Sequence, residues 1–270
     1  MTVLSIRQAL ELYRIDPSVL DEQPDYTPFS GEFFFKGNSV GCIVLHGIAG
    51  TPANVRVVAE RLKKDGYTVL APVVAGHRST VRSLMQTTAE DWADSVTGFY
   101  DRLVAEGCTK IFCIGLSLGG LLSIDLAERK PLEGLVPICA PIRMKPFLLF
   151  ANAIRHVYSV VRYPPREDAN EYTEMGIGLA TRSVHEIKRE SERIRKHLDA
   201  ITCPTLWISA RFDNKVEPVS EAIFHRGAVN AKSYNTIEME NSPHGCTYGP
   251  ERDAVAEHVA AFVRHTLENA

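Results

Sequence analysis

The sequence predicts an α/β fold in which a mostly parallel sheet is covered by helices on both faces. Short β-branched or apolar runs alternate with longer helical patterns, as expected for consecutive βαβ units. The chain has 270 residues and 45% hydrophobic composition, which suits one large domain with a substantial core. We therefore treat residues 1–270 as a single domain.

Seven segments have the composition of strands and are bounded by turn residues. The first is expected to lie at a sheet edge and to run antiparallel, and the others to form the rest of the sheet. The segments are 31–36, 40–45, 68–71, 110–114, 135–139, 205–209 and 233–238. Helical patterns lie between and after them at 52–64, 89–106, 118–128, 220–225 and 251–268.

The regular alternation is interrupted between about residues 143 and 196, an interval that is too long for one ordinary crossover. It contains an apolar segment with aromatic residues, the pair Pro164-Pro165, and a charged helical stretch over 186–196. We interpret it as an insertion that covers the C-terminal edge of the sheet as a cap or lid. The alternative is a helix pair that packs away from any site.

Charge and cysteine usage exclude several classes of function. The formal net charge is -3 with acidic and basic residues interspersed, so neither nucleic acid nor an acidic membrane surface is expected as a partner. The N-terminus lacks a secretory signal pattern, and the most apolar segment, 147–154, is far shorter than the roughly 20 residues that span a bilayer. Six cysteines without a CxxC pair are typical of reduced thiols. We expect a soluble cytoplasmic protein without metal or cofactor, and leave its oligomeric state open.

The strongest chemical motif is the pattern Gly115-Leu116-Ser117-Leu118-Gly119. It directly follows the predicted strand 110–114 and directly precedes a helical run. In this strand–turn–helix context the glycines permit a strained turn that lifts a serine hydroxyl above the sheet. Ser117 is therefore the candidate nucleophile. The alternative is a glycine-rich helix start with a capping serine.

A serine nucleophile needs a base and an orienting acid. Asp213 follows the predicted strand 205–209, and His244 follows the last predicted strand, which gives the chain order Ser, Asp, His. Glu217 competes with Asp213 for the acid's role, although Pro218 favours a helix-start position for Glu217. The sequence predicts a triad of Ser117, Asp213 and His244.

Acyl transfer also needs two N–H donors for the oxyanion. We expect one from Leu118, which follows the nucleophile at the start of a helix. The other is expected from Ile48, in the glycine-rich turn after the strand 40–45. In the same turn, His46 is expected to order the backbone rather than to act as the base. The alternative is a plain glycine-rich turn.

From about Val40 to its C-terminus the chain resembles bacterial carboxylesterases of the α/β-hydrolase superfamily, in the branch that also contains bacterial monoacylglycerol lipases. The resemblance rests on Leu45-His46-Gly47-Ile48-Ala49-Gly50-Thr51, Gly76-His77, Glu90-Asp91-Trp92, Gly115-Leu116-Ser117-Leu118-Gly119-Gly120, His197-Leu198-Asp199-Ala200-Ile201-Thr202-Cys203-Pro204-Thr205, Ala210-Arg211-Phe212-Asp213 and Ser242-Pro243-His244. It implies the same triad and the same oxyanion donors, with a small cap over the site.

Two features depart from the family's pattern. The chain has Gly76-His77-Arg78 where the family has Gly-His-Gly, so Arg78 is expected to alter a turn or to intrude near the entrance. About thirty additional residues precede the first predicted strand, and the sequence assigns them no role.

The expected function is hydrolysis of uncharged carboxylic esters with short to medium acyl chains through an acyl-enzyme, with a small-molecule ester as the only partner. A monoacylglycerol lipase, thioesterase, acyltransferase or carbon–carbon bond hydrolase would use the same triad. An alternative of another class is a ligand-binding protein on a hydrolase scaffold. Such proteins often lose a triad member, whereas this triad is complete.

Overall fold

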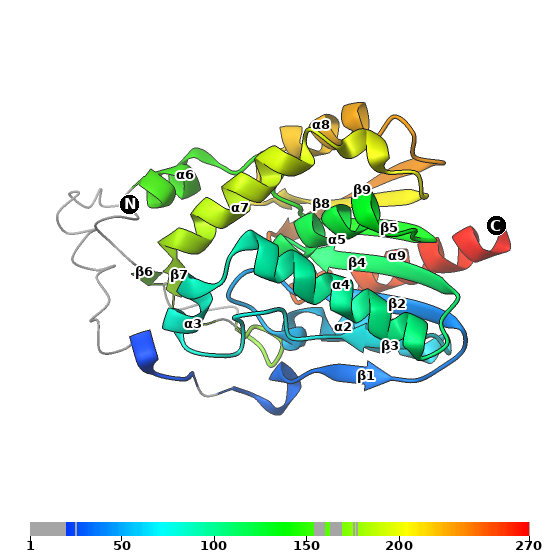
Figure 1. Ribbon diagram of the computed structural model, residues 1–270, viewed down its shortest axis with the longest axis horizontal. Helices are drawn as coiled ribbons and strands as arrows, with labels where there is room; N and C mark the ends of the chain where they lie inside the picture. The colour runs from blue at the N-terminus through cyan, green and yellow to red at the C-terminus, as the bar shows by residue number, and fades with distance from the viewer. Residues whose placement is uncertain are drawn as a thin grey trace.

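A seven-stranded sheet forms the centre of the molecule, with helices on both faces (Figure 1). The computed structural model describes residues 20–24, 26–153, 160–162, 169–174, 176 and 178–269. The strands are β1 (Phe33–Phe35), β2 (Val40–Leu45), β3 (Thr68–Ala71), β4 (Lys110–Leu116), β5 (Gly134–Ile138), β8 (Thr205–Phe212) and β9 (Tyr234–Pro243). Their order is β1-β3-β2-β4-β5-β8-β9, and only β1 pairs antiparallel, with β3. The predicted fold class and antiparallel edge strand are confirmed.

The central strands are continuous apolar runs because helices cover both of their faces. Every residue of β2 and of β5 is buried. On one face lie α4 (Ala89–Ala105), α5 (Leu118–Arg129), α7 (Thr181–Ile194) and α8 (Val219–Gly227), and on the other lie α2 (Arg56–Lys64) and α9 (Arg252–Glu268). Trp92 is fully buried in the first core, and Val58 in the second.

The predicted helix 52–64 is divided in the structure. A short 3-10 helix, η3 (Pro52–Val55), precedes α2. Thr51 caps η3 through its side chain, and Oδ1 of Asn54 accepts the Thr51 N–H, which fixes a tight turn before the α-helix begins. This compact turn holds the glycine-rich loop that follows β2 against the end of the sheet.

The interval 143–196 contains α6 (Pro146–Ala153), the two-stranded ladder β6 (Val160–Arg162) with β7 (Gly178–Ala180), and α7. Helix α7 begins at Thr181, five positions earlier than the charged stretch predicted. The first turn of α7 contains Thr181 and Ser183, which are weak helix formers and give no sign of a helix start. Burial of Val184 and Ile187 holds this turn in the helix. The pair Pro164-Pro165 lies outside the described residues.

One further helix, α3 (Val81–Gln86), follows the Gly76-His77-Arg78 turn and was not predicted. Thr80 caps it by accepting the Ser83 N–H. Within the described part of the chain, no helix combines the length and apolarity that crossing a bilayer requires.

Candidate active site

Ser117 occupies a strained turn between β4 and α5. Its φ of 55° and ψ of -114° lie outside the regions that L-residues ordinarily adopt. Its N–H donates to the carbonyl of Ile138, 2.8 Å away, which fixes the turn above the sheet. Gly119 is required because a Cβ there would lie 2.5 Å from the carbonyl oxygen of Leu45. The turn thus presents the Ser117 hydroxyl beyond the ends of the parallel strands.

The structure brings Ser117, His244 and Asp213 into one hydrogen-bonded chain. The Ser117 hydroxyl donates to Nε2 of His244 at 2.9 Å, and Nδ1–H of His244 donates to Oδ2 of Asp213 at 2.8 Å. Asp213 follows β8, and His244 follows β9 directly, as the sequence predicts. This geometry can deprotonate the hydroxyl while the carboxylate holds the imidazole in the required tautomer.

Asp213 is a largely buried carboxylate held from both sides. Its Oδ1 accepts the backbone N–H groups of Lys215 at 2.7 Å and Val216 at 3.0 Å. Burial raises the pKa of this carboxyl, but the bonds from His244 and from the two N–H groups outweigh burial and lower it overall. Asp213 is therefore ionised at neutral pH, as an orienting acid must be.

Glu217 is held at a different place from Asp213. Its N–H donates to the carbonyl of Arg143 at 2.8 Å, and its carbonyl accepts the Ser220 N–H at the start of α8. Among the described contacts, His244 meets the carboxylate of Asp213 rather than that of Glu217. This contact favours Asp213 over Glu217 as the orienting acid.

The two expected oxyanion donors belong to backbone segments next to Ser117. Gly47 lies so close to the serine that a Cβ there would be 3.3 Å from Cβ of Ser117, and Ile48 lines the same pocket as the serine. Leu118 is the first residue of α5, where backbone N–H groups have no acceptor within the helix and the helix dipole favours negative charge. Both N–H groups belong to backbone that the fold fixes before any ligand binds.

His46 orders the glycine-rich turn, as expected. Its Nε2 accepts the Val74 N–H at 3.1 Å, so Nδ1 carries the proton and donates to the carbonyl of Gly47 at 2.9 Å. Burial, with the neighbouring His77, lowers the pKa of His46 to about 3. A fully buried imidazole whose pKa is lowered this far stays neutral, which suits a structural role rather than the role of base.

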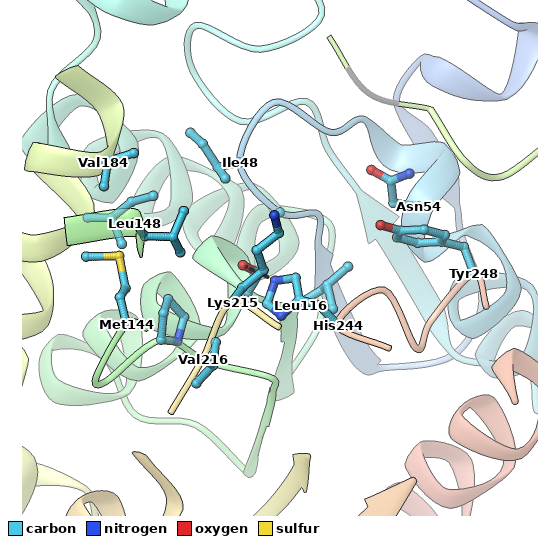
Figure 2. A pocket seen from close by; sticks show the side chains of 14 residues that line it. Ile48, Asn54, Leu116, Met144, Leu148, Val184, Lys215, Val216, His244 and Tyr248 are labelled. Atoms are coloured by element: carbon cyan, nitrogen blue, oxygen red, sulfur yellow. Dashed lines mark hydrogen bonds between the residues drawn. The ribbon is translucent and has the colours of Figure 1, made fainter. Parts of the chain in front are cut away.

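An apolar pocket with about 690 Å³ of empty space opens above Ser117. Figure 2 shows Met144, Leu148 and Val184 along one side and Asn54 with Tyr248 along the other, with His244 between them. Because Ser117 is only 8% exposed, this pocket is the route by which a ligand reaches it. The complete set of lining residues is Gly47, Ile48, Asn54, Leu116, Ser117, Pro141, Met144, Leu148, Val184, Ile187, Lys215, Val216, His244 and Tyr248.

The thiols nearest to the site are buried. Sγ of Cys139 lies 3.9 Å from Sγ of Cys246, and both residues are at most 2% exposed. Cys139, Asp213 and His244 each place one potential metal-ligand atom within 4.8 Å of the others, but the hydrogen bond from Nδ1 of His244 to Asp213 accounts for that proximity. The full burial of Cys246 suits a structural thiol.

Sequence reasoning did not identify the residues that form the pocket walls. Val184 and Ile187 come from α7, and Leu148 comes from α6, inside the irregular interval. The helical spacing of the apolar residues Val184, Ile187 and Ile194 is the sequence signal that would have indicated an inward face. Asn54 lies in η3 and Tyr248 in a turn after β9, and neither local sequence predicts which side chain faces a pocket.

The fold and the site together define a serine hydrolase. The chain belongs to the family Hydrolase_4, described as serine aminopeptidase, S33, which matches residues 39–239. It is 30% identical over 234 residues to a carboxylesterase of Bacillus subtilis (strain 168), covering 86% of this chain and 95% of the relative. It is also 30% identical over 239 residues to a thermostable monoacylglycerol lipase of Bacillus sp. (strain H-257), covering 85% and 92% respectively.

The fold is similar to that of solved lipolytic enzymes. A structure described with LipS and LipT, two metagenome-derived lipolytic enzymes, aligns with a TM-score of 0.81 at 25% identity. The alignment covers 89% of this chain and 100% of that chain. These similarities confirm the α/β-hydrolase fold and the branch to which the motifs pointed.

Proposed function

We propose that the protein is a carboxylesterase that hydrolyses uncharged, small-molecule esters through an acyl-enzyme. The observation that carries the proposal is the hydrogen-bonded chain from Ser117 through His244 to Asp213 at the base of an apolar pocket. The relatives named carboxylesterase and monoacylglycerol lipase support an ester as the substrate.

The first half-reaction forms the acyl-enzyme. Oγ of Ser117 bonds to the ester carbonyl carbon while its proton passes to Nε2 of His244. The carbonyl oxygen becomes an oxyanion that the N–H groups of Ile48 and Leu118 bind. The tetrahedral intermediate then collapses, the carbon–alkoxy bond breaks, and His244 returns the proton to the departing alcohol.

The second half-reaction frees the enzyme. His244 takes a proton from water, whose oxygen attacks the acyl carbon, and the same two N–H groups bind the new oxyanion. The bond to Oγ of Ser117 then breaks, and His244 gives the proton back to the serine. Asp213 stays ionised throughout and stabilises the imidazolium in both halves.

The pocket walls support an ester with an acyl chain of short to medium length. Apolar side chains from α6 and α7 form the walls, and we propose that the interval 143–196 acts as a cap over them.

We also propose that the protein is cytoplasmic. Its cysteines are free and buried, as is usual for proteins of a reducing compartment.

The lining also distinguishes ester hydrolysis from the aminopeptidase activity in the family's description. An aminopeptidase must bind the ammonium group of a peptide's N-terminus, for which a carboxylate is the natural partner. The described residues that line the pocket include no carboxylate, and apart from the imidazole of His244 their one ionisable side chain with a charge at neutral pH is the cation Lys215. The lining therefore disfavours a substrate with a free ammonium group. A monoacylglycerol is a second candidate, favoured by the lipase relative.

The test is a substrate panel. It compares p-nitrophenyl esters from acetate to palmitate, monoacylglycerols of matching chains and aminoacyl p-nitroanilides, with S117A as the control. We expect the highest kcat/KM on esters of short to medium chain, and a loss of several orders of magnitude in S117A. Faster turnover of the anilides than of every ester would overturn the proposal.

A further inference from the structure

Glu174 is a buried carboxylate outside the triad and outside the pocket lining. It lies just before β7 and is 8% exposed. Buried carboxylates are rare unless they are paired, because removing the charge from water is costly. Its Oε2 accepts the hydroxyl of Thr51 at 2.7 Å, and its Oε1 accepts the N–H of Thr27 at 2.5 Å. Hydrogen bonds to an ionised acceptor are stronger than neutral ones.

Thr51 places this carboxylate on the turn that carries Ile48. Thr51 ends the glycine-rich turn after β2 and caps η3, where its Oγ1 also accepts the Ala53 N–H at 3.3 Å. Between Ile48 and Thr51, the Ala49 carbonyl accepts the N–H of Gly176 at 2.7 Å. Ala49 has a φ of 55°, a left-handed conformation that such a contact helps to hold. Glu174 and Gly176 therefore contact the turn at Thr51 and at Ala49, both within three residues of Ile48.

The other partner of Glu174 belongs to the N-terminal segment 26–30, to which the sequence assigned no role. Oη–H of Tyr26 donates to the carbonyl of Ser79 at 3.1 Å, and Nε–H of Arg78 donates to Oγ of Ser30 at 3.0 Å. The guanidinium of Arg78 also lies 5.4 Å from the centre of the Tyr26 ring. The N-terminal segment is thus attached to the turn that holds Arg78, and Glu174 joins it to Thr51.

We propose that Glu174 is a positioning residue for the oxyanion donor Ile48, acting through Thr51 and through its near neighbour Gly176, with segment 26–30 as the second support of its carboxylate. Ile48 can bind an oxyanion only if its N–H points at the space beside Oγ of Ser117. That N–H shares its peptide group with the Gly47 carbonyl, which accepts the Gly50 N–H at 3.1 Å. Ala49 and Thr51 stand on either side of Gly50, so their contacts with Gly176 and Glu174 hold the turn that sets the direction of this peptide. The inference rests on the proposed function, because the oxyanion arises only in acyl transfer.

The experiment measures kcat and KM for the best p-nitrophenyl ester in five variants of the full chain: E174Q, T51V, T51S, T51V/E174Q and the control E238Q. Glu238 is an exposed carboxylate on β9. T51S keeps the hydroxyl that T51V removes. The concentration of competent sites is titrated with a fluorophosphonate, so that kcat is expressed per reactive serine and misfolded protein does not count.

A displaced oxyanion donor weakens binding of the transition state and leaves substrate binding intact. Complete loss of one donor costs on the order of 100-fold or more in kcat, so a partial displacement is expected to cost about tenfold. E174Q and T51V should therefore lose about tenfold in kcat per titrated site at nearly unchanged KM, while T51S and E238Q stay close to the wild type. The loss in kcat of the double variant should equal that of the less active single variant, because both changes remove the same contact.

Two results would overturn the inference. One is a wild-type kcat per titrated site in E174Q and T51V. The other is a loss that appears only as fewer titratable sites or as a higher KM, which would mean that Glu174 supports the fold or the pocket rather than Ile48.

The reaction with the fluorophosphonate separates this inference from the proposed function. Oγ of Ser117 bonds to phosphorus, fluoride leaves, and the proton passes to His244, while the same N–H groups bind the phosphoryl oxygen. If the wild type reacts with the probe but hydrolyses no ester, the proposed function fails, and the rate of inactivation in E174Q against T51S still tests Glu174. If the wild type neither reacts nor hydrolyses, both are overturned.

Discussion

The two oxygens of Asp213 carry different contacts, and this division determines what the residue can do. Oδ1 accepts two backbone N–H groups, and Oδ2 accepts Nδ1–H of His244. Because the pKa of this carboxyl is lowered in the folded protein, it contributes stability above its unfolded pKa of about 3.9, and that contribution is lost as the pH falls through the folded value. At neutral pH the charge stabilises both the fold and the imidazolium.

This division predicts the effect of D213N. The backbone N–H groups of Lys215 and Val216 should hold the amide oxygen at the Oδ1 position, which turns the amide NH₂ toward Nδ1 of His244. Nε2 would then carry the proton and could not accept one from Ser117. We expect kcat to fall about 1,000-fold or more, as wrong-tautomer variants of such triads do. Steady-state kinetics with E217Q as the matched control checks this, and an equal loss in E217Q would assign the acid's role to Glu217.

At the scale of elements, α5 and α7 meet through a buried cluster of charges. Arg193 on α7 contacts Asp125 and Glu128 on α5, with Nη1–H donating to Oε2 of Glu128 at 2.8 Å, and it also pairs with Glu190. Burial raises the pKa of Glu128 to about 7, and the neighbouring carboxylates add to that rise against the effect of Arg193. The cluster joins the helix that starts at the nucleophile to the helix that lines the pocket.

The raised pKa of Glu128 predicts a pH-dependent stability. Between its unfolded pKa of about 4.3 and its folded pKa of about 7, the folded state keeps a proton that the unfolded state has lost. The free energy of unfolding contributed by this group therefore falls as the pH rises through that window. Relative to E128Q, the wild type should lose roughly 2 kcal/mol between about pH 5 and about pH 8 in urea unfolding experiments. Parallel pH curves for the two proteins would contradict the raised pKa.

The elements that sequence reasoning could not place share one physical property. Helix α7 begins with Thr181, Arg182 and Ser183, which carry no start signal, and Ala180 before it makes no side-chain cap. The strands β6 and β7 have three residues each, too short for any alternation to emerge. Tertiary packing rather than local propensity decides such segments, so the interval 143–196 could be bounded from sequence but not resolved.

At the scale of the whole molecule, the site is assembled from segments far apart in the chain, yet its chemistry was predictable. Ile48, Ser117, Asp213 and His244 each follow a predicted strand, and the C-terminal ends of neighbouring parallel strands meet at one edge of the sheet. That rule brings the four together without knowledge of the helices between them. The supports of the site, such as Glu174, depend on side-chain contacts of irregular segments, which no periodic pattern encodes.

The two departures from the family's pattern also meet at this scale. Arg78 has a φ of 50°, the left-handed conformation that favours glycine, and its guanidinium contacts Ser30 and Tyr26 of the N-terminal segment. Arg78 does not line the pocket above Ser117. Arg78 therefore takes a conformation open to glycine, and its side chain attaches the additional N-terminal residues to this turn.

The central claim is that Ser117 is the nucleophile, and its most direct test is covalent labelling. The wild type and S117A are treated with a fluorophosphonate, digested and examined by mass spectrometry while ester hydrolysis is followed in parallel. We predict one adduct on Ser117 in the wild type, loss of hydrolysis in proportion to labelling, and no adduct in S117A. An adduct on another residue, or ester hydrolysis retained by S117A, would contradict the account.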